Sequence, residues 1–444
     1  MQDKDLNTII GDLKKNSIFR MSLGSKELFH SNFLEYLWDL DEDHGSFISM
    51  INDFIDKPLP PPGSNYHFAR EKKNFDICIF HYEDGRTYKN RESSKKEVFD
   101  LIIENKVKSI PYKEQLEEYK KVVTKNNKGK PCQYILLSLS EFFPDNDLIQ
   151  SNEQTAVRKD ICGWHLINYE DLAAKIKEKY TNHHCFKPYI KDYCKFVVLL
   201  VSLEKYILPE NIEDQPLFND QIIEQLKKIR VHDLYIKLRA SWFIMSLKQR
   251  LKDIEGFKDH IYVVHKYDDF NKDGVEQDRK DGIFLNADIN QGNGQAAAWI
   301  LNKPDTKKAG NTYEIVIQGK QYRHGIALSC TTDNDSDKYL RLNELYKKIE
   351  RCDKAIDFLN FYEDYKKEGI VFPDKDDKDD KEVFRGSRTE ERKGGVKKEG
   401  HFCCYDKSYI YRYEKIGDND SIKSLLTRMV FDIVKISSAL PQII

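Results

Sequence analysis

The chain has 444 residues and a formal net charge of −2, with 33% charged and 40% hydrophobic residues. This length suffices for two or three domains with a substantial core. No apolar run approaches the roughly 20 residues that a membrane helix needs, and the first residues lack the apolar core of a signal peptide. We therefore expect a cytoplasmic protein without a membrane segment. Because the net charge is slightly negative, any affinity for nucleic acid has to come from a local basic region.

Nine cysteines are scattered along the chain, and none of them forms a C-x-x-C pair. Zinc ribbons and disulfide frameworks both need paired cysteine spacings, so neither is indicated. Free thiols in an odd number are typical of a reducing compartment, which agrees with the cytoplasmic expectation.

Two helical patterns open the chain. Apolar residues recur at helical spacing over residues 5–20 and again over about 26–40. In the second segment Glu27 is followed by His30 and Ser31 at i+3 and i+4, so the three side chains share one face. Taken alone, this trio is typical of ordinary polarity near the start of a helix.

Two strand-like runs follow, Asn74–Phe80 and Val98–Val107, with a turn signal between them. Side chains alternate between the two faces of a strand. One face of the second run is therefore apolar, with Phe99, Leu101, Ile103 and Val107. Glu104 and Lys106 project together from the other face. An isolated Glu-x-Lys pair is usually a solvated ion pair at a sheet edge, so the upstream strand has to support any other interpretation.

An antiparallel hairpin of the two runs supplies that support. If position 76 faces 104, then 78 faces 102 and 80 faces 100. Directly opposed residues have Cβ atoms roughly 5 Å apart, so Asp76 and Glu104 can share one metal ion. Asp100 is the rival carboxylate, but four residues along one strand span roughly 13 Å. Asp76 is therefore the preferred partner of Glu104.

Asp76 followed by Glu104-Asn105-Lys106 resembles the signature of the PD-(D/E)XK nuclease superfamily. Upstream, residues 27–39 are similar to the helical Glu-x-x-His-Ser opening of one bacterial branch of that superfamily. Downstream, residues 108–119 resemble the helix that follows the catalytic strand there, with its Gln-Leu-x-x-Tyr pattern. The proline that gives the superfamily its name is absent here, because Phe75 precedes the first aspartate.

The resemblance covers about residues 15–205. It implies an α/β fold for residues 1–205, with a restriction-endonuclease-like mixed sheet flanked by helices. For residues 206–444 the sequence pattern predicts an α+β recognition or regulatory domain. Within that domain we expect a mobile charged insertion at 373–400, where apolar residues are nearly absent.

The resemblance also assigns roles in hydrolysis of a phosphodiester. It places five side chains in catalysis, namely Glu27, Asp76, Glu104, Lys106 and Gln115. Asp76, Glu104 and the backbone carbonyl of Asn105 would bind the metal, and hard oxygen ligands favour Mg²⁺, with Mn²⁺ as a substitute. Lys106 would orient the attacking water, and Gln115 would position that water or the phosphate.

Eight lysines and three glutamates lie between residues 106 and 130. Such a local excess can contact phosphates. We nominate Lys108, Lys113, Lys120 and Lys121 for nucleic-acid binding. The alternative is a solvated helix face and loop without a ligand.

These observations predict a Mg²⁺-dependent nuclease, with DNA favoured over RNA as substrate and endonucleolytic cleavage favoured. Analogy with bacterial relatives extends the prediction to phage defence or restriction. The alternative function is a catalytically silent, nucleic-acid-binding or assembly subunit. A homo-oligomer or a regulatory protein partner would be compatible with either function, and the second half of the chain could restrain the nuclease until a ligand binds.

Overall fold

The computed structural model describes residues 5–22, 27–40, 43–60, 66–83, 96–108, 113–140, 149–150, 160–181, 187–257, 260–263, 282–290, 293–301, 311–328, 403–405, 409–417 and 419–443. The predicted insertion at 373–400 lies outside these residues. The chain divides into two compact units. Unit 1 comprises Met1–Pro209 and Gln221–Leu238, and unit 2 comprises Glu210–Asp220 and Arg239–Ile444.

Unit 1 contains a seven-stranded mixed sheet in the order β1-β2-β3-β4-β7-β6-β5. Strands β1, β2 and β3 pair antiparallel, whereas β3 pairs parallel with β4 and β4 with β7. The five longer strands are β1 (Tyr66–Lys72), β2 (Phe75–Glu83), β3 (Lys96–Lys106), β4 (Gln133–Ser138) and β7 (Trp164–Asn168). The edge is completed by two-residue strands, β6 (Asp160–Ile161) and β5 (Ile149–Gln150). The predicted mixed sheet of a restriction-endonuclease-like fold is confirmed.

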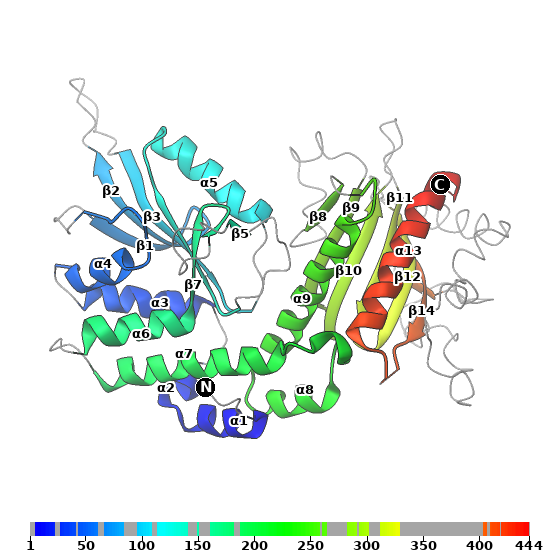
Figure 1. Cartoon of the computed structure of the whole chain (residues 1–444), viewed down its shortest axis with the longest axis horizontal. Coiled ribbons are helices and arrows are strands. Elements are labelled where there is room, and N and C mark those ends of the chain that lie inside the picture. The colour runs from blue at the N-terminus through cyan, green and yellow to red at the C-terminus, as the bar shows by residue number, and fades with distance from the viewer. Residues whose placement is uncertain are drawn as a thin grey trace. The chain divides into compact units, whose positions relative to one another are not determined.

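Helices flank this sheet (Figure 1). Helix α3 contacts β1, β2 and β3, while α5 connects β3 to the parallel strand β4 and packs on β3. The helices of this unit are α1 (Leu6–Lys15), α2 (Ser17–Ser22), α3 (Glu27–Asp39), α4 (Gly45–Asn52), α5 (Lys113–Asn127), α6 (Tyr169–Tyr180), α7 (Pro188–Ile207) and α8 (Asp220–Lys227). Strand β3 is therefore in contact with both α3 and α5.

The first predicted helix, over residues 5–20, is two helices that meet at Asn16. The side chain of Asn16 accepts a hydrogen bond from the Phe19 backbone N–H at 2.9 Å and donates one to the Asp192 carbonyl at 2.9 Å. The first contact satisfies an amide at the start of α2, as an N-cap residue does. The apolar periodicity continues through both helices, which is why the pattern alone does not reveal the break.

Strand β1 is not predicted from the sequence. Most of its side chains are half-buried, so the segment lacks the apolar alternation that marks an inner strand. A tight turn joins it to β2, and Lys73 and Asn74 adopt positive φ angles of 54° and 68° there. The second antiparallel partner of β2, strand β1, is thus revealed only by the structure.

The predicted hairpin register is correct at one end and wrong at the other. Cys78 faces Ile102 as expected, but Phe80 faces Phe99 instead of Asp100. The register shifts between Ile79 and Phe80, which makes Asp100 the extra residue of a β-bulge. Because alternation is interrupted there, Phe99 does not continue the face of Leu101 as predicted, and its ring packs 6.2 Å from that of Phe80.

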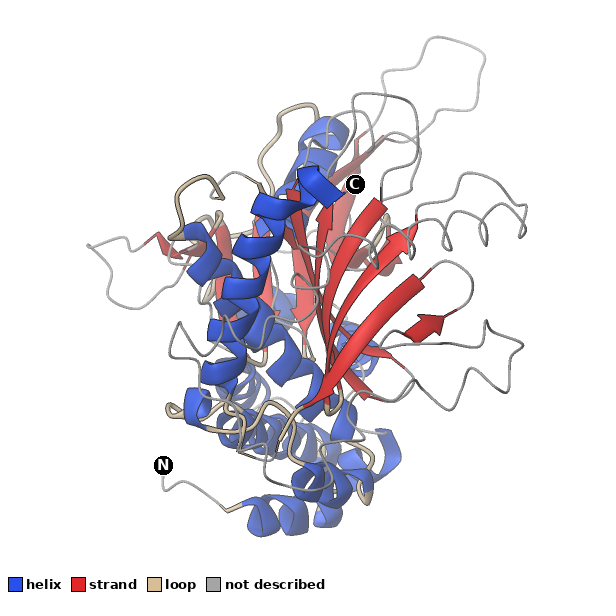
Figure 2. Ribbon diagram, turned by 90° about the vertical axis from the view of Figure 1, so that its right-hand side faces the viewer, coloured by secondary structure: helices blue, strands red, loops and turns tan. Residues whose placement is uncertain are grey.

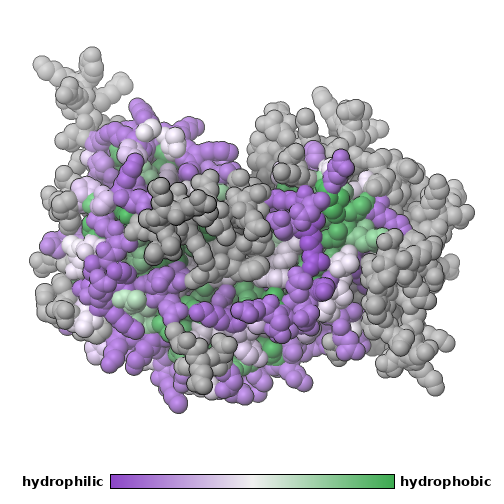
Figure 3. All heavy atoms as spheres, viewed as in Figure 1, coloured by the Kyte–Doolittle hydropathy of each residue, from purple (hydrophilic) through white to green (hydrophobic). Residues whose placement is uncertain are grey.

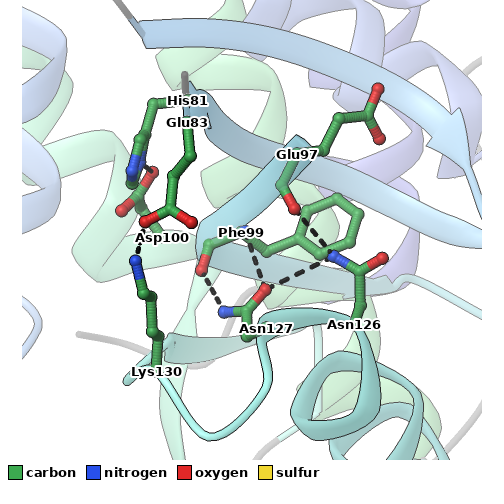
Figure 4. A network of polar contacts seen from close by, with 8 residues as sticks. All are labelled: His81, Glu83, Glu97, Phe99, Asp100, Asn126, Asn127 and Lys130. Atoms are coloured by element: carbon green, nitrogen blue, oxygen red, sulfur yellow. Dashed lines mark hydrogen bonds and ion pairs between the residues drawn. The ribbon is translucent and has the colours of Figure 1, made fainter. Parts of the chain in front are cut away.

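Beside the bulge, β3 extends past the start of β4, and a side chain takes the place of the missing strand (Figure 4). Asn127, at the end of α5, accepts a hydrogen bond from the Phe99 N–H at 3.0 Å and donates one to the Phe99 carbonyl at 2.8 Å. Asp100 instead contacts His81, whose Nδ1 lies 2.7 Å from its carboxylate. The backbone polar groups at the bulge are thereby satisfied without a further strand.

Unit 2 contains a second, twisted seven-stranded sheet in the order β13-β14-β12-β11-β10-β9-β8 (Figure 2). Helix α13 contacts β10 and β11. The strands are β8 (Ile261–Val263), β9 (Gly282–Asn290), β10 (Asn293–Leu301), β11 (Asn311–Gln318), β12 (Gln321–Leu328), β13 (Cys403–Tyr405) and β14 (Tyr409–Lys415). The helical segments of unit 2 are the short 3-10 helix η2 (Ile212–Asp214) and α13 (Ile422–Ile443). Helix α9 (His232–Lys252) is divided, because its residues up to Leu238 belong to unit 1 and those from Arg239 to unit 2. A second sheet in the C-terminal region, accompanied by helices, agrees with the predicted fold class.

Hydrophilic side chains cover most of the described surface in the view of Figure 3. Among the described residues, the exposed large hydrophobic side chains are Leu28, Tyr82 and Tyr189. No helix in the described part of the chain is both long enough and apolar enough to cross a membrane.

Candidate active site

The C-terminal end of β3 brings the signature residues together. Lys106 Nζ lies 2.7 Å from Glu104 Oε1, and the side chains are 10% and 2% exposed. Asp76 on β2 joins them, because its Oδ2 accepts a hydrogen bond of 2.7 Å from the Asn105 backbone N–H. Neighbouring strands therefore place two carboxylates and one amine at the same point of the sheet, as predicted from the strand alternation.

Gln115 reaches the same point from α5. Its Nε2 donates hydrogen bonds to Glu104 Oε1 at 3.1 Å and to the Tyr119 hydroxyl at 3.0 Å. Two buried oxygens, Glu104 Oε2 and Gln115 Oε1, receive no hydrogen bond from the described residues. Buried polar atoms are normally satisfied, so these two unsatisfied acceptors indicate that the site can bind an electron-poor ligand.

Burial and charge shift the pKa values of the site. Burial raises the pKa of Glu104 to about 7; Lys106 opposes this increase and Asp76 adds to it. Burial also raises the pKa of Asp76, although the Asn105 N–H lowers it. For Lys106 burial would lower the pKa, but Glu104, Glu27 and Asp76 together raise it above its ordinary value. Lys106 therefore stays protonated at neutral pH. Its single positive charge is surrounded by three acidic side chains, those of Glu104, Glu27 and Asp76.

Glu27 opens α3 and contacts the chain immediately after Lys106. Its Oε1 accepts hydrogen bonds from the backbone N–H groups of Val107 at 3.1 Å and Lys108 at 3.3 Å. The carboxylate thus holds the end of β3, and its negative charge contributes to the raised pKa of Lys106. The structure places all five predicted catalytic side chains around one strand end.

The donor set fits a divalent metal ion. Mg²⁺ is commonly bound through one or two carboxylates, with water or substrate phosphate completing the shell. Asp76 and Glu104 would supply these carboxylates, the Asn105 carbonyl would add a neutral oxygen, and the unsatisfied Glu104 Oε2 is free to bind. Within the described residues, no three His, Cys, Asp or Glu side chains cluster closely enough to hold a metal alone. Any such ion therefore needs ligands beyond the carboxylates.

The four nominated phosphate-binding lysines differ in their surroundings. Lys108 forms an ion pair with Asp233, and the Lys120 ammonium donates to the Cys162 carbonyl at 2.9 Å. Lys121 is 75% exposed, with Glu118 at 3.9 Å. The side chain of Lys113 lies outside the described part of the structure. Of the three described lysines, Lys121 is the one most available to a phosphate.

His30 lies in an aromatic core instead of facing the carboxylates with Glu27. It is fully buried, its Nδ1 lies 3.0 Å from the Tyr193 hydroxyl, and its ring stacks on Phe196 at 5.7 Å. Burial lowers the pKa of His30 to about 3, so the ring is neutral at physiological pH. Although Glu27 and His30 were expected to share one face of the helix, only the Glu27 side chain contacts the end of β3.

Two contacts that the sequence analysis missed involve the side chain of Asn105. Its Nδ2 donates to the Glu27 carbonyl at 2.9 Å, and its Oδ1 accepts from the Tyr169 hydroxyl. From the sequence, only the backbone carbonyl of Asn105 was expected to take part in the site. A polar residue inside an otherwise apolar strand was the available signal, whereas nothing in the sequence links Tyr169 to it.

A mixed sheet that carries a buried carboxylate and an amine on β3, beside a second carboxylate on β2, is typical of the restriction-endonuclease-like class of folds. Residues 16–195 match the family model described as the PD-(D/E)XK nuclease superfamily. The matched range includes all five predicted catalytic residues and Asn105. This match places residues 16–195 in the PD-(D/E)XK nuclease superfamily. Comparisons with curated proteins and with solved structures found no match.

Proposed function

We propose that this protein is a Mg²⁺-dependent nuclease and that its substrate is DNA, cleaved internally. The observation that carries the proposal is the buried Glu104 carboxylate. One of its oxygens is bound by Lys106 and Gln115, and the other has no partner in the described structure. A purely structural ion pair would leave no such acceptor beside a second carboxylate.

Each residue has a part that follows from its contacts. A bound divalent cation would make an attacking water more acidic and offset the charge on the phosphate. Lys106 keeps its proton, so it serves as a hydrogen-bond donor to water or phosphate oxygen and as a positive charge, and it does not serve as a general base. Gln115 orients Glu104, and Glu27 fixes the backbone that follows Lys106.

The test is a cleavage assay with the purified full-length protein. Plasmid, linear duplex, single-stranded DNA and RNA are incubated with Mg²⁺, Mn²⁺ or EDTA. We expect nicking and linearisation of plasmid DNA that depends on the metal and is lost in Asp76→Asn, Glu104→Gln and Lys106→Ala.

Two exposed residues provide matched controls. Lys195→Ala removes an amine from a lysine that is 57% exposed, and Glu224→Gln neutralises a carboxylate that is 65% exposed. Both should cleave like the wild-type protein. Cleavage of RNA alone would replace the DNA assignment, and cleavage that persists in all three site variants would reject the proposed site.

Residues 206–444 are proposed to recognise the substrate or a regulatory partner, and 1–205 to carry the nuclease. A truncated chain used to test this division has to keep the ion pair between Asp233 and Lys108, because Lys108 lies two residues after Lys106. Residues 221–238 also group with unit 1. A truncated chain should therefore end after α9, because ending it at 209 would remove Asp233.

Phage defence or restriction is proposed as the cellular role, and this step rests on family analogy alone. Expression in a phage-sensitive bacterium tests it. We expect fewer plaques with the wild-type protein than with Lys106→Ala, whereas equal plaque numbers for the two would remove this part of the proposal.

A further inference from the structure

Asn105 occupies the position between Glu104 and Lys106, and its side chain is completely buried. A buried amide is costly unless it is hydrogen-bonded, and an apolar side chain would suit this strand equally well. The amide is held on both sides. Its Nδ2 donates to the Glu27 carbonyl at 2.9 Å and to Ser31 Oγ at 3.4 Å, and its Oδ1 accepts from the Tyr169 hydroxyl.

The backbone of Asn105 belongs to the site itself. Its N–H donates to Asp76 Oδ2 at 2.7 Å, and its peptide groups join Glu104 to Lys106 on β3. The peptide groups and the side chain of one residue share a Cα atom. A contact that fixes the side chain therefore also limits rotation of the backbone that holds Asp76.

Tyr169 is the first residue of α6 and is completely buried. Its ring packs against His30, with 4.9 Å between the centroids, and its hydroxyl extends to Asn105. The phenol ring thus fills the core between helices, while the hydroxyl is the group that reaches the active strand. A phenylalanine would fill the same space without the hydroxyl.

We propose that Tyr169 is a positioning residue of the nuclease site and acts through Asn105 on metal binding by Asp76 and Glu104. This inference rests on the proposed function, because it assumes that these carboxylates bind a divalent cation. Residues that orient metal ligands without touching the metal typically change its affinity by about 10- to 100-fold when they are removed.

The decisive variant is Tyr169→Phe in the full-length protein, with Tyr180→Phe as its matched control. Tyr180 ends the same helix, is equally buried, and donates its hydroxyl to the Leu37 carbonyl at 3.2 Å. Both variants lose a buried hydrogen bond of a tyrosine hydroxyl. Of the two tyrosines, only Tyr169 contacts Asn105. A general loss of stability should therefore appear in both variants, whereas a loss of metal affinity should appear only in Tyr169→Phe.

Mn²⁺ affinity is measured by calorimetry without substrate, and kcat and KM are measured separately. We expect Tyr169→Phe to bind Mn²⁺ about 10-fold more weakly and to lose kcat more than it changes KM, while Tyr180→Phe matches the wild type. Asn105→Ala should weaken binding similarly, and adding Tyr169→Phe to it should weaken binding no further, because the tyrosine acts through this amide.

Thermal unfolding identifies any variant that is not folded at the assay temperature. In that case Ser31→Ala replaces Tyr169→Phe as a milder change, since it removes two long contacts of 3.4 Å, one from Asn105 Nδ2 and one to the Glu27 carbonyl. A smaller weakening of Mn²⁺ binding than in Asn105→Ala would support the role of the amide. Unchanged affinity in both Ser31→Ala and Asn105→Ala would overturn it.

The outcomes separate this inference from the proposed function. If Tyr169→Phe binds Mn²⁺ and cleaves DNA like the wild type, the positioning role is wrong and the nuclease stands. If the wild type cleaves nothing but binds Mn²⁺ more tightly than Tyr169→Phe does, the positioning role stands and the nuclease is wrong. If the wild type does not bind Mn²⁺ at all, both are wrong.

Discussion

Lys106 Nζ lies 2.7 Å from Glu104 Oε1, and this ion pair is almost completely removed from solvent. The two residues are separated by one position on β3, so the strand itself holds them on the same face. Asp76 and Glu27 add further negative charge around the ammonium, and their effect appears in its raised pKa. The site is thus more acidic than its single lysine can neutralise, which is the electrostatic condition for binding a cation.

Glu104 should make the stability of the metal-free protein depend on pH. Burial raises its pKa from 4.5 to about 7, so between these values the folded chain holds a proton that the unfolded chain has released. The stability that this carboxyl contributes is therefore lost as the pH rises through that window. In EDTA we expect wild type to lose roughly 1–3 kcal/mol relative to Glu104→Gln between pH 5 and pH 8.

Urea unfolding of both proteins at the two pH values measures this difference. The comparison with Glu104→Gln cancels the titration of groups that do not interact with Glu104, and Glu224→Gln should follow the wild type. Parallel pH profiles for wild type and Glu104→Gln would show that the pKa of Glu104 is not raised.

Lys106→Met should destabilise the protein and abolish most of its activity. The variant leaves the Glu104 carboxylate buried without its ammonium, and breaking a buried pair in this way costs about 3 kcal/mol at pH 8. At pH 5 the loss should be smaller, since Glu104 can then take up a proton. We also expect kcat to fall about 100-fold or more, because a charge that stabilises the transition state is lost.

Equilibrium unfolding at both pH values and steady-state cleavage rates test these effects. Lys195→Met is the control, because its amine is 57% exposed and lies 4.0 Å from Asp192. A loss of stability in Lys106→Met that is the same at pH 5 and pH 8 would argue against the coupling with Glu104.

Asn127→Ala should open the edge of β3 at the bulge. Asn127 is fully buried and bonds both backbone groups of Phe99, so the alanine variant leaves a buried N–H and a buried carbonyl without partners. We expect a loss of about 2 kcal/mol in the free energy of unfolding and faster hydrogen exchange at the Phe99 amide.

Asn126→Ala serves for comparison, because Asn126 bonds only the Glu97 carbonyl of this strand, at 3.0 Å, in a half-buried position. Its loss of stability should be smaller, with exchange at Phe99 unchanged. Equal exchange rates at Phe99 in wild type and Asn127→Ala would contradict the structural role assigned to Asn127.

In unit 2, Asp432→Ala should loosen the attachment of α13 to its sheet. Asp432 is fully buried, accepts a hydrogen bond of 2.7 Å from the Tyr322 hydroxyl and lies 3.1 Å from His324 Nε2. Removing the carboxylate leaves two buried groups of β12 without this acceptor. We expect unit 2 to lose about 3 kcal/mol in unfolding experiments.

Asp220→Ala is the control for that experiment. Its carboxylate is 64% exposed and pairs with Lys320 at 2.8 Å on the surface, and exposed pairs contribute only about 0–1 kcal/mol. Similar losses for the two variants would show that the buried contacts of Asp432 do not stabilise the unit.

The sequence by itself determined the chemistry of the candidate site. Strand alternation is a local property, so Glu104 and Lys106 had to share a face. The Cys78–Ile102 pairing agrees with the hairpin register in which position 76 was assumed to face 104. The helix that carries Gln115 was also indicated, through the resemblance of residues 108–119. Together with the motif order, these features sufficed to indicate a mixed α/β nuclease fold.

Tertiary structure alone decided how the site is supported. The bulge at Asp100 depends on contacts with β2 and on Asn127, 27 residues further along the chain. The hydrogen bond from Tyr169 to Asn105 joins residues 64 positions apart, and the burial of His30 needs α7. Such contacts follow from packing of distant segments, for which hydrophobic periodicity carries no information. Local patterns thus place the reactive groups, and long-range packing places the groups that orient them.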